Sequence, residues 1–151
     1  MKRPSRFELV QKMWPELAQK TDVSIGDKEA AIGINTRAAE AIASDFIGRF
    51  DAAYAVKGPG VLSVPLIPGR EAQYLTIEDL QDDADHAVSR GDRMSIDHAE
   101  KVGDVVSFVK GFNFNKGVVI ILADYTRFSC YPLSRDNPAA AITAMMQEMV
   151  G

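Results

Sequence analysis

The six consecutive apolar residues VVIILA at 118–123 restrict the fold of this chain more than any other segment. Six residues are too few for a membrane-spanning helix, which needs about 20, but they match the usual length of a strand. A strand that is apolar at every position places apolar side chains on both faces of its sheet. The segment therefore predicts a central strand in a sheet that is covered on both sides.

Further strands are predicted before and after this run. VVSFV at 105–109 and FSCYPL at 128–133 are apolar and bounded by turn-forming residues, so the three runs predict a C-terminal three-strand meander. The segment DVSIGDKEAAIGIN at 22–35 alternates around a Gly-Asp-Lys turn and predicts an N-terminal hairpin. VLSVPLI at 61–67 predicts a short strand, and Pro65 restricts it to a sheet edge or to a strand end because proline has no N–H.

About five helices are predicted around these strands from capping residues and from apolar residues at helical spacing. They cover residues 5–20 with an interruption at Pro15, 35–57, 76–91, 95–103 and 137–151. Helices and strands that are segregated along the chain are typical of α+β proteins. We therefore expect an α+β fold over a single globular domain, residues 1–151, with a mostly antiparallel sheet that includes one edge strand.

Composition narrows the class of protein. The chain is 46% hydrophobic and 25% charged, as in ordinary soluble domains. Its single cysteine, Cys130, excludes an intrachain disulfide and a zinc site built on several thiolates. The basic start MKRPSRFELV is interrupted by Glu8 before it reaches the length of a signal peptide. We expect a cytoplasmic protein with no cofactor and no membrane association.

Two eight-residue segments, DHAVSRGD at 85–92 and DHAEKVGD at 97–104, are similar in sequence, and each begins with Asp-His. We call this repeat the Asp-His echo. One interpretation is a metal-assisted hydrolase using residues 78–104, because carboxylate and imidazole groups bind divalent metals. Its ligands would be Asp82, His86, Asp97 and His98. The other interpretation is two helix ends, since in each copy a glycine, Gly91 or Gly103, stands where a left-handed C-cap would end a helix. We expect the two helix ends and no metal.

A second motif, VKGFNFNKGVVI at 109–120, resembles the first hairpin of cold-shock nucleic-acid-binding domains, which read V-K-W-F-N-x-x-K-G. The resemblance implies contact with single-stranded nucleic acid through basic and aromatic side chains. These are Lys110, Phe112, Phe114 and Lys116. The motif departs from the family at Gly111, where the stacking tryptophan stands. The pI near 5.2 also disfavours a polyanion as partner, so we expect a turn rather than a nucleic-acid site.

Charge is distributed unevenly along the chain. Residues 1–20 carry a net charge of +3, whereas residues 76–104 carry −6. Neither a Ser-His-Asp order nor a phosphate-binding loop accompanies this polarity, so no catalytic residue is predicted. We expect a non-catalytic protein-interaction module, such as an inhibitor, immunity, accessory or chaperone-like protein, with another protein or a second copy as partner. The expected contact residues are Glu78, Asp79, Asp82, Asp83 and Asp85.

The last predicted helix carries an apolar stripe of Ile142, Met145, Met146 and Met149 at i, i+3, i+4 and i+7. Methionine is common both in irregular cores and on adaptable binding surfaces. A terminal helix usually stays ordered by burying its apolar stripe. We therefore predict that this stripe docks on the core.

Overall fold

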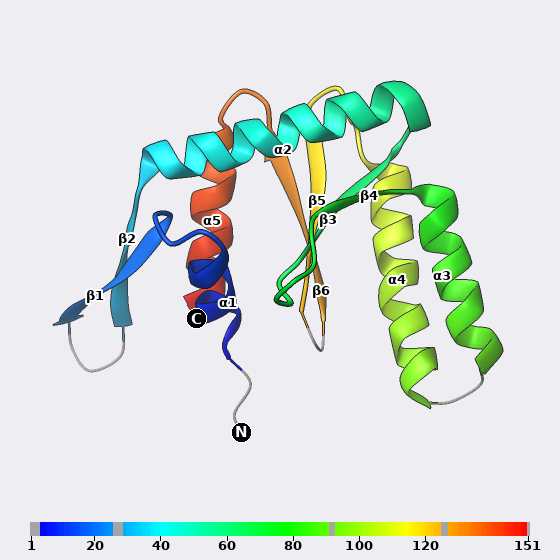
Figure 1. The fold of residues 1–151 in the computed structure, drawn as a ribbon, viewed down its shortest axis with the longest axis horizontal. Coiled ribbons are helices and arrows are strands. Elements are labelled where there is room, and N and C mark those ends of the chain that lie inside the picture. Colours follow the sequence, from blue (N-terminus) through cyan, green and yellow to red (C-terminus); the bar gives the residue numbers. More distant parts are fainter. Residues whose placement is uncertain (1–3, 26–28, 91–92, 125–126, 151) are drawn as a thin grey trace.

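The computed structural model describes residues 4–25, 29–90, 93–124 and 127–150, and the side chains of 20–32, 87, 90, 93–96 and 150 lie outside that description. The described part of the chain contains five helices and six strands (Figure 1). In order they are α1 (Arg6–Met13), β1 (Ala18–Ile25), β2 (Glu29–Ile34), α2 (Thr36–Lys57), β3 (Gly60–Pro65), β4 (Gln73–Thr76), α3 (Ile77–Arg90), α4 (Arg93–Gly111), β5 (Gly117–Ala123), β6 (Phe128–Ser134) and α5 (Pro138–Val150). The α+β class is confirmed.

The main sheet has four strands in the order β4-β3-β5-β6. β3 pairs with β5 in parallel, with Leu62 opposite Ile120, whereas β4 and β6 run antiparallel to their neighbours. The parallel pair is possible because the long α3–α4 connection returns the chain to the start of the sheet. The expected N-terminal hairpin forms a separate two-stranded sheet, β1-β2. Its Gly-Asp-Lys turn lies outside the described residues.

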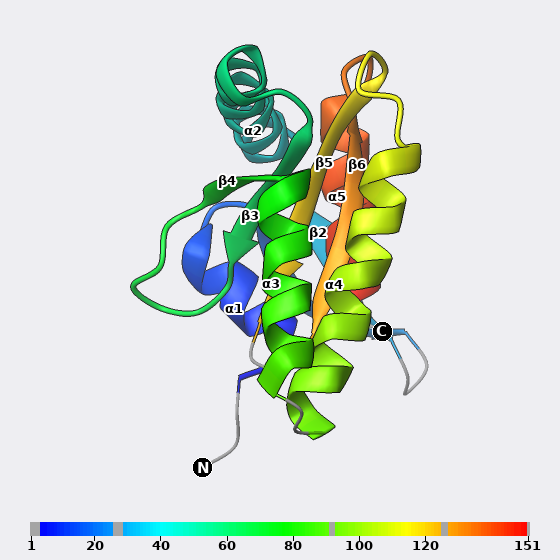
Figure 2. The ribbon, with the colours of Figure 1, turned by 90° about the vertical axis from the view of Figure 1, so that its right-hand side faces the viewer.

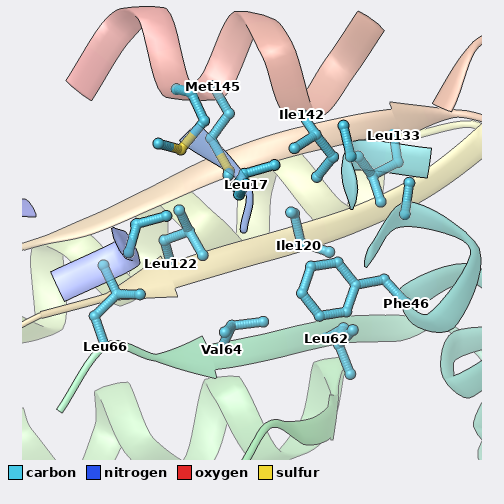
Figure 3. Packing of buried hydrophobic residues seen from close by; sticks show 14 of the residues in the cluster. Leu17, Phe46, Leu62, Val64, Leu66, Ile120, Leu122, Leu133, Ile142 and Met145 are labelled. Carbon is cyan, nitrogen blue, oxygen red and sulfur yellow. The ribbon is translucent and has the colours of Figure 1, made fainter. Parts of the chain in front are cut away.

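Both faces of the main sheet are covered, as the apolar run of β5 predicts. Ile120 and Leu122 pack on one face with residues of α1, α2 and α5, including Phe46 and Met145 (Figure 3). Ile121 on the other face packs with residues of α3 and α4. Figure 2 shows α3 and α4 in front of the strands, with α1 and α5 behind. The result is a three-layer arrangement of helices, sheet and helices.

The C-terminal helix docks on this core. Ile142, Met145 and Met146 are at most 1% exposed, and Met149 is partly buried against the same cluster. The predicted docking of the stripe is therefore confirmed. Asn137 precedes Pro138 at the helix start, where the missing proline N–H costs no hydrogen bond.

The strand expected at 105–109 is wrong, because this segment is the last part of α4. Valine has a high strand propensity, but these valines fit helical spacing equally well. Val102, Val105, Val106 and Val109 stand at i, i+3, i+4 and i+7, and all four are at most 5% exposed. Burial of this stripe against the sheet stabilises the helix over a strand. Without a strand at 105–109, β5 and β6 form a two-stranded hairpin rather than part of a three-strand meander.

The position of β3 in the sheet agrees with the sequence in part. Pro65 is the last residue of β3, which confirms the strand-end alternative, and β3 itself is an interior strand between β4 and β5. The edge beside it is β4, whose four residues were too few to form a recognisable pattern. Asn35 caps the start of α2, since its side chain accepts a hydrogen bond from the N–H of Ala38 at 3.2 Å.

Among the residues that the structure describes, no helix combines the length and the apolar character that crossing a membrane requires.

Candidate functional site

The acidic face predicted from the sequence is the outer face of α3. All five expected contact residues are exposed there: Glu78, Asp79, Asp82, Asp83 and Asp85. Leu80 and Ala84 are buried against the sheet. This division follows the amphipathic pattern of a helix that covers a core. The structure thus keeps the five carboxylates together on one surface in contact with solvent.

One of these carboxylates has a clear structural role. The N–H of Asp79 donates to the Thr76 hydroxyl at 3.1 Å, and the N–H of Thr76 donates back to an Asp79 carboxylate oxygen at 3.2 Å. This reciprocal capping box satisfies donors that the start of a helix leaves free, and it confirms the helix start read from the sequence. Asp79 therefore stabilises α3 whatever else its charge does.

The Asp-His echo produces one ionic contact between the two helices. His98 Nε2 lies 3.0 Å from Asp83 Oδ2, with both side chains well exposed, and the imidazole packs near the ring of Phe128 with centroids 5.3 Å apart. The contact therefore uses Asp83 and not Asp82, which the metal interpretation had named. Within the described residues, no group of three or more His, Cys, Asp or Glu side chains is arranged to hold a metal ion.

The helix-end interpretation of the echo is wrong for the second copy and agrees with the observed end of the helix in the first copy. Gly103 lies inside α4, so the cap expected there is wrong. An interior glycine costs a helix about 1 kcal/mol relative to alanine. Burial of the valine stripe on both sides of Gly103 stabilises the helix and offsets this cost. In the first copy α3 ends at Arg90, but Gly91 itself lies outside the described residues.

The basic-aromatic motif lies at the end of α4 and in the turn before β5. Its Val109 and Lys110 are helical, so the strand that the cold-shock resemblance implies is absent from this part of the described chain. Asn113 shapes the turn, because its side chain accepts from the N–H of Asn115 at 3.0 Å and its carbonyl accepts from the N–H of Lys116 at 3.1 Å. The expected turn is confirmed, but it joins a helix to a strand.

The two phenylalanines of this motif pack inside an aromatic cluster. Phe114 stacks on Phe50 with ring centroids 5.6 Å apart, and Phe112 meets Phe114 edge-on at 5.3 Å. Lys110 and Lys116 are exposed. Both rings are thus partly buried and occupied by protein contacts, which leaves less of their surface for stacking on a base.

The same cluster holds a phenol in an apolar setting. Tyr74 on β4 lies edge-on to Phe50 and donates a hydrogen bond to the carbonyl of Gly58. Burial, assisted by the neighbouring Tyr54, raises the pKa of the Tyr74 phenol to about 12. The hydroxyl therefore acts as a structural donor at neutral pH.

A crevice at the carboxyl ends of β3 and β5 is the feature that sequence reasoning missed. After β3 the chain turns toward β4 at one edge of the sheet, and after β5 it turns toward β6 at the opposite edge. Adjacent parallel strands whose connections diverge leave an opening at their carboxyl ends, where ligands of open α/β sheets bind. Here the cavity has a volume of about 620 Å³, which falls in the range of small-molecule sites.

The floor of the crevice follows from strand register. Ser63 lies opposite Gln73, and Pro65 lies opposite Ala123. Side chains alternate along a strand, so Ser63 and Pro65 face the same side of the sheet as Val61. Val61 packs under α3 and α4, whereas Ser63 and Pro65 lie beyond the part of the sheet that these helices cover. Phe128 of β6 pairs with Ala123 and completes the row.

A tight turn forms the wall on the β3 side. The N–H of Arg70 donates to the carbonyl of Ile67 at 3.3 Å, and Gly69 has a φ of 82°. Pro-Gly at the centre of such a turn is typical of type II geometry, because only the glycine adopts positive φ without strain. Arg70 and Glu71 follow the turn and line the cavity. The Pro68-Gly69 pair was the local signal that could have located this wall.

Asp124, one partner of a buried ion pair, lines the opposite wall. Arg6 Nε lies 2.9 Å from Asp124 Oδ2, and both side chains are at most 8% exposed. The approach is ionic rather than a well-directed hydrogen bond, since this Nε–H has no hydrogen-bond acceptor within the described structure. The guanidinium also donates to the Leu122 carbonyl at 2.9 Å and to the Ser129 hydroxyl at 2.5 Å. Burial lowers the pKa of Arg6, and the Asp124 carboxylate opposes that shift.

The single cysteine faces the α3–α4 side of the sheet near this crevice. Cys130 lies opposite Ile121 and is partly buried. Burial raises the pKa of its thiol, so the reactive thiolate is less populated than in an exposed cysteine. The geometry gives Cys130 a packing role.

Comparison with known proteins finds no matching family model, no matching curated protein and no matching solved structure.

Proposed function

We propose that this chain is a non-catalytic protein-interaction module whose contact surface is the acidic face of α3, defined by Glu78, Asp79, Asp82, Asp83 and Asp85. The observation that carries the proposal is the exposure of all five carboxylates on one helix. α3 contains a single arginine or lysine, Arg90, against them. A surface of one sign attracts and orients a partner of the opposite sign.

This charge pattern does not stabilise α3. Glu78 and Asp82, and likewise Asp79 and Asp83, stand four residues apart, and Asp82 is three residues from both Asp79 and Asp85. Each of these four like-charge pairs destabilises a helix by about 0.2–0.5 kcal/mol, which is roughly 1–2 kcal/mol in all. Only the first turn gains from the helix dipole. A basic partner would relieve this repulsion, and that favours a binding role for the pattern.

The partner we propose is a protein with a basic surface rather than a second copy of the chain. The basic N-terminal segment, residues 1–20, was the natural complement to the acidic face in a homodimer. Its Arg6, however, is buried and paired with Asp124. The segment therefore has less charge at its surface than its sequence indicates, and the electrostatic case for self-association is weaker.

The test compares two double variants that remove the same charge. Asp82→Asn/Asp85→Asn neutralises the centre of the acidic face, whereas Glu16→Gln/Glu40→Gln neutralises two exposed carboxylates elsewhere. Tagged chains are used to capture partners from extract of the native host, and captured proteins are identified by mass spectrometry. The affinity of each purified candidate is then measured between about 50 and 500 mM salt, because screening weakens contacts between exposed charges.

We expect the acidic-face variant to lose the partner and the control to retain it, with binding that weakens as salt rises. The free energy of unfolding of the acidic-face variant should rise by about 0.5–1.5 kcal/mol, since three of the four repulsive pairs disappear. Equal loss in both variants, or binding that is independent of salt, would place the contact elsewhere.

A further inference from the structure

We propose that the crevice at the carboxyl ends of β3 and β5 binds a small zwitterion, namely a free α-amino acid or short peptide with an apolar side chain. The proposal is independent of the acidic face, because none of its five carboxylates lines the crevice. It rests on where the cavity lies, on which polar and apolar side chains line it and on which charges remain available in it.

The position is a place where the sheet itself leaves space. β3 and β5 are paired through Pro65 and Ala123, and one further backbone hydrogen bond, from the N–H of Leu66 to the carbonyl of Ala123 at 2.7 Å, closes the pair. Beyond this point the two connections diverge. An opening of this kind is set by topology and needs no movement to form.

The side chains along the sheet change character where the helical cover ends. Val61 of β3 is buried and Leu75 of β4 is partly buried beneath α3 and α4. The next positions on the same face of these two strands carry the hydroxyl of Ser63 and the amide of Gln73. Both line the cavity. A sheet face that continued under a helix would be apolar at these positions, so polar groups here fit contact with water or a polar ligand.

The apolar part of the ligand has a defined place. Pro65, Ile67 and the ring of Phe128 line the cavity beside the polar groups, and Phe128 is held by its contact with His98. An apolar or aromatic side chain would replace water against these surfaces. Pockets that combine an apolar wall with a few fixed polar groups are typical of specific small-molecule sites.

The charges that line the crevice select for a ligand with both signs. Asp124 is neutralised by Arg6 at 2.9 Å, so its carboxylate shapes the wall instead of attracting a cation. Arg70 and Glu71 are exposed, and within the described part of the chain neither forms an ion pair. A guanidinium binds a carboxylate through two parallel hydrogen bonds, and the adjacent Glu71 carboxylate fits an ammonium. An α-amino acid carries both groups.

The experiment is a calorimetric and thermal-shift titration of the full chain with L-phenylalanine, L-leucine and the dipeptide Leu-Phe. Three analogues serve as ligand controls: 3-phenylpropionate lacks the ammonium, phenethylamine lacks the carboxylate, and N-acetyl-phenylalanine amide lacks both. Arg70→Ala tests the site, and Arg37→Ala, which removes an exposed arginine from the start of α2, is the matched control. Comparing the affinity for the free amino acids with the affinity for the dipeptide distinguishes the two sources of the zwitterion.

We expect saturable binding of at least one zwitterion with a rise in melting temperature. Each analogue and the Arg70→Ala variant should bind about ten-fold more weakly or worse, because each loses a charge-assisted hydrogen bond, while Arg37→Ala should bind normally. Binding of the doubly blocked amide at equal affinity, equal effects of the two arginine variants, or no saturable binding would each overturn the proposal.

Discussion

Replacing Arg6 by methionine should destabilise the chain strongly, although the residue lies near the N-terminus. The guanidinium is buried, lies 2.9 Å from the Asp124 carboxylate, and donates to the Leu122 carbonyl and the Ser129 hydroxyl. Methionine fills much of the same space but leaves the Asp124 carboxylate without its buried cation. Removing one partner of a buried ion pair typically costs about 3–5 kcal/mol. For a chain of this size that lowers the melting temperature by roughly 6–20 °C.

A double-mutant cycle separates this effect from lost packing. Asp124→Asn leaves the Arg6 charge unpaired and should cost a similar amount. Asparagine keeps the acceptor for the N–H of Arg127, which now binds an Asp124 carboxylate oxygen at 2.9 Å. Because Arg6→Met/Asp124→Asn leaves no uncompensated buried charge, we expect the double variant to be no less stable than either single variant.

Urea unfolding followed by the fluorescence of Trp14, the single tryptophan, measures each corner of the cycle. Trp14 packs edge-on against Phe46 at 5.7 Å, so its environment reports on the same core. Costs that simply add in the double variant, or a loss below about 1 kcal/mol for Arg6→Met, would show that water reaches the pair and that our account of its burial is wrong.

Four further outcomes are expected. Removing residues 137–151 should give an aggregated or unfolded product, because the helix buries part of the core; a cooperative melt near that of the full chain would make the helix a binding surface. In alkaline titration at 295 nm, the Tyr74 phenol should ionise only near pH 12, and Tyr74→Phe should remove that step. Since its folded pKa exceeds the ordinary value of 10.0, the stability it contributes is complete below about pH 10 and is lost as pH rises from 10 to 12. Cys130 should react with a thiol reagent at pH 8 more slowly in the folded chain than in urea, and equal rates would contradict its burial. Zn²⁺, Mn²⁺ and Mg²⁺ should leave the melting temperature unchanged, whereas a rise abolished by His86→Ala would restore the metal interpretation.

Features that depend on neighbours within one turn of chain could be read from the sequence. Asn35 and the Thr76–Asp79 pair cap helices because each hydrogen bond spans only three residues. The apolar run of β5 predicted a strand covered on both faces, since alternation places its side chains on opposite sides. The acidic face of α3 was likewise visible, because the carboxylates are close in sequence and helical spacing gathers them.

Segment 105–109 shows where local information ends. A run of valines fits a strand by propensity and a helix by spacing, and short apolar runs do not distinguish the two. The decision comes from burial of Val102, Val105, Val106 and Val109 against the sheet, which involves residues far away along the chain. Tertiary packing therefore overrides the intrinsic preference of valine.

The crevice and the ion pair beside it were decided by tertiary structure alone. Arg6 and the Leu122 carbonyl that it binds are 116 residues apart, and no pattern within a window of sequence connects them. The crevice likewise exists because β3 and β5 are parallel neighbours whose connections leave in opposite directions. Local contacts a few residues long were enough to locate most of the helices and strands and the charge of α3, but not the second half of α4. Strand order, and with it the place where a ligand fits, depends on which distant segments bury their apolar faces together.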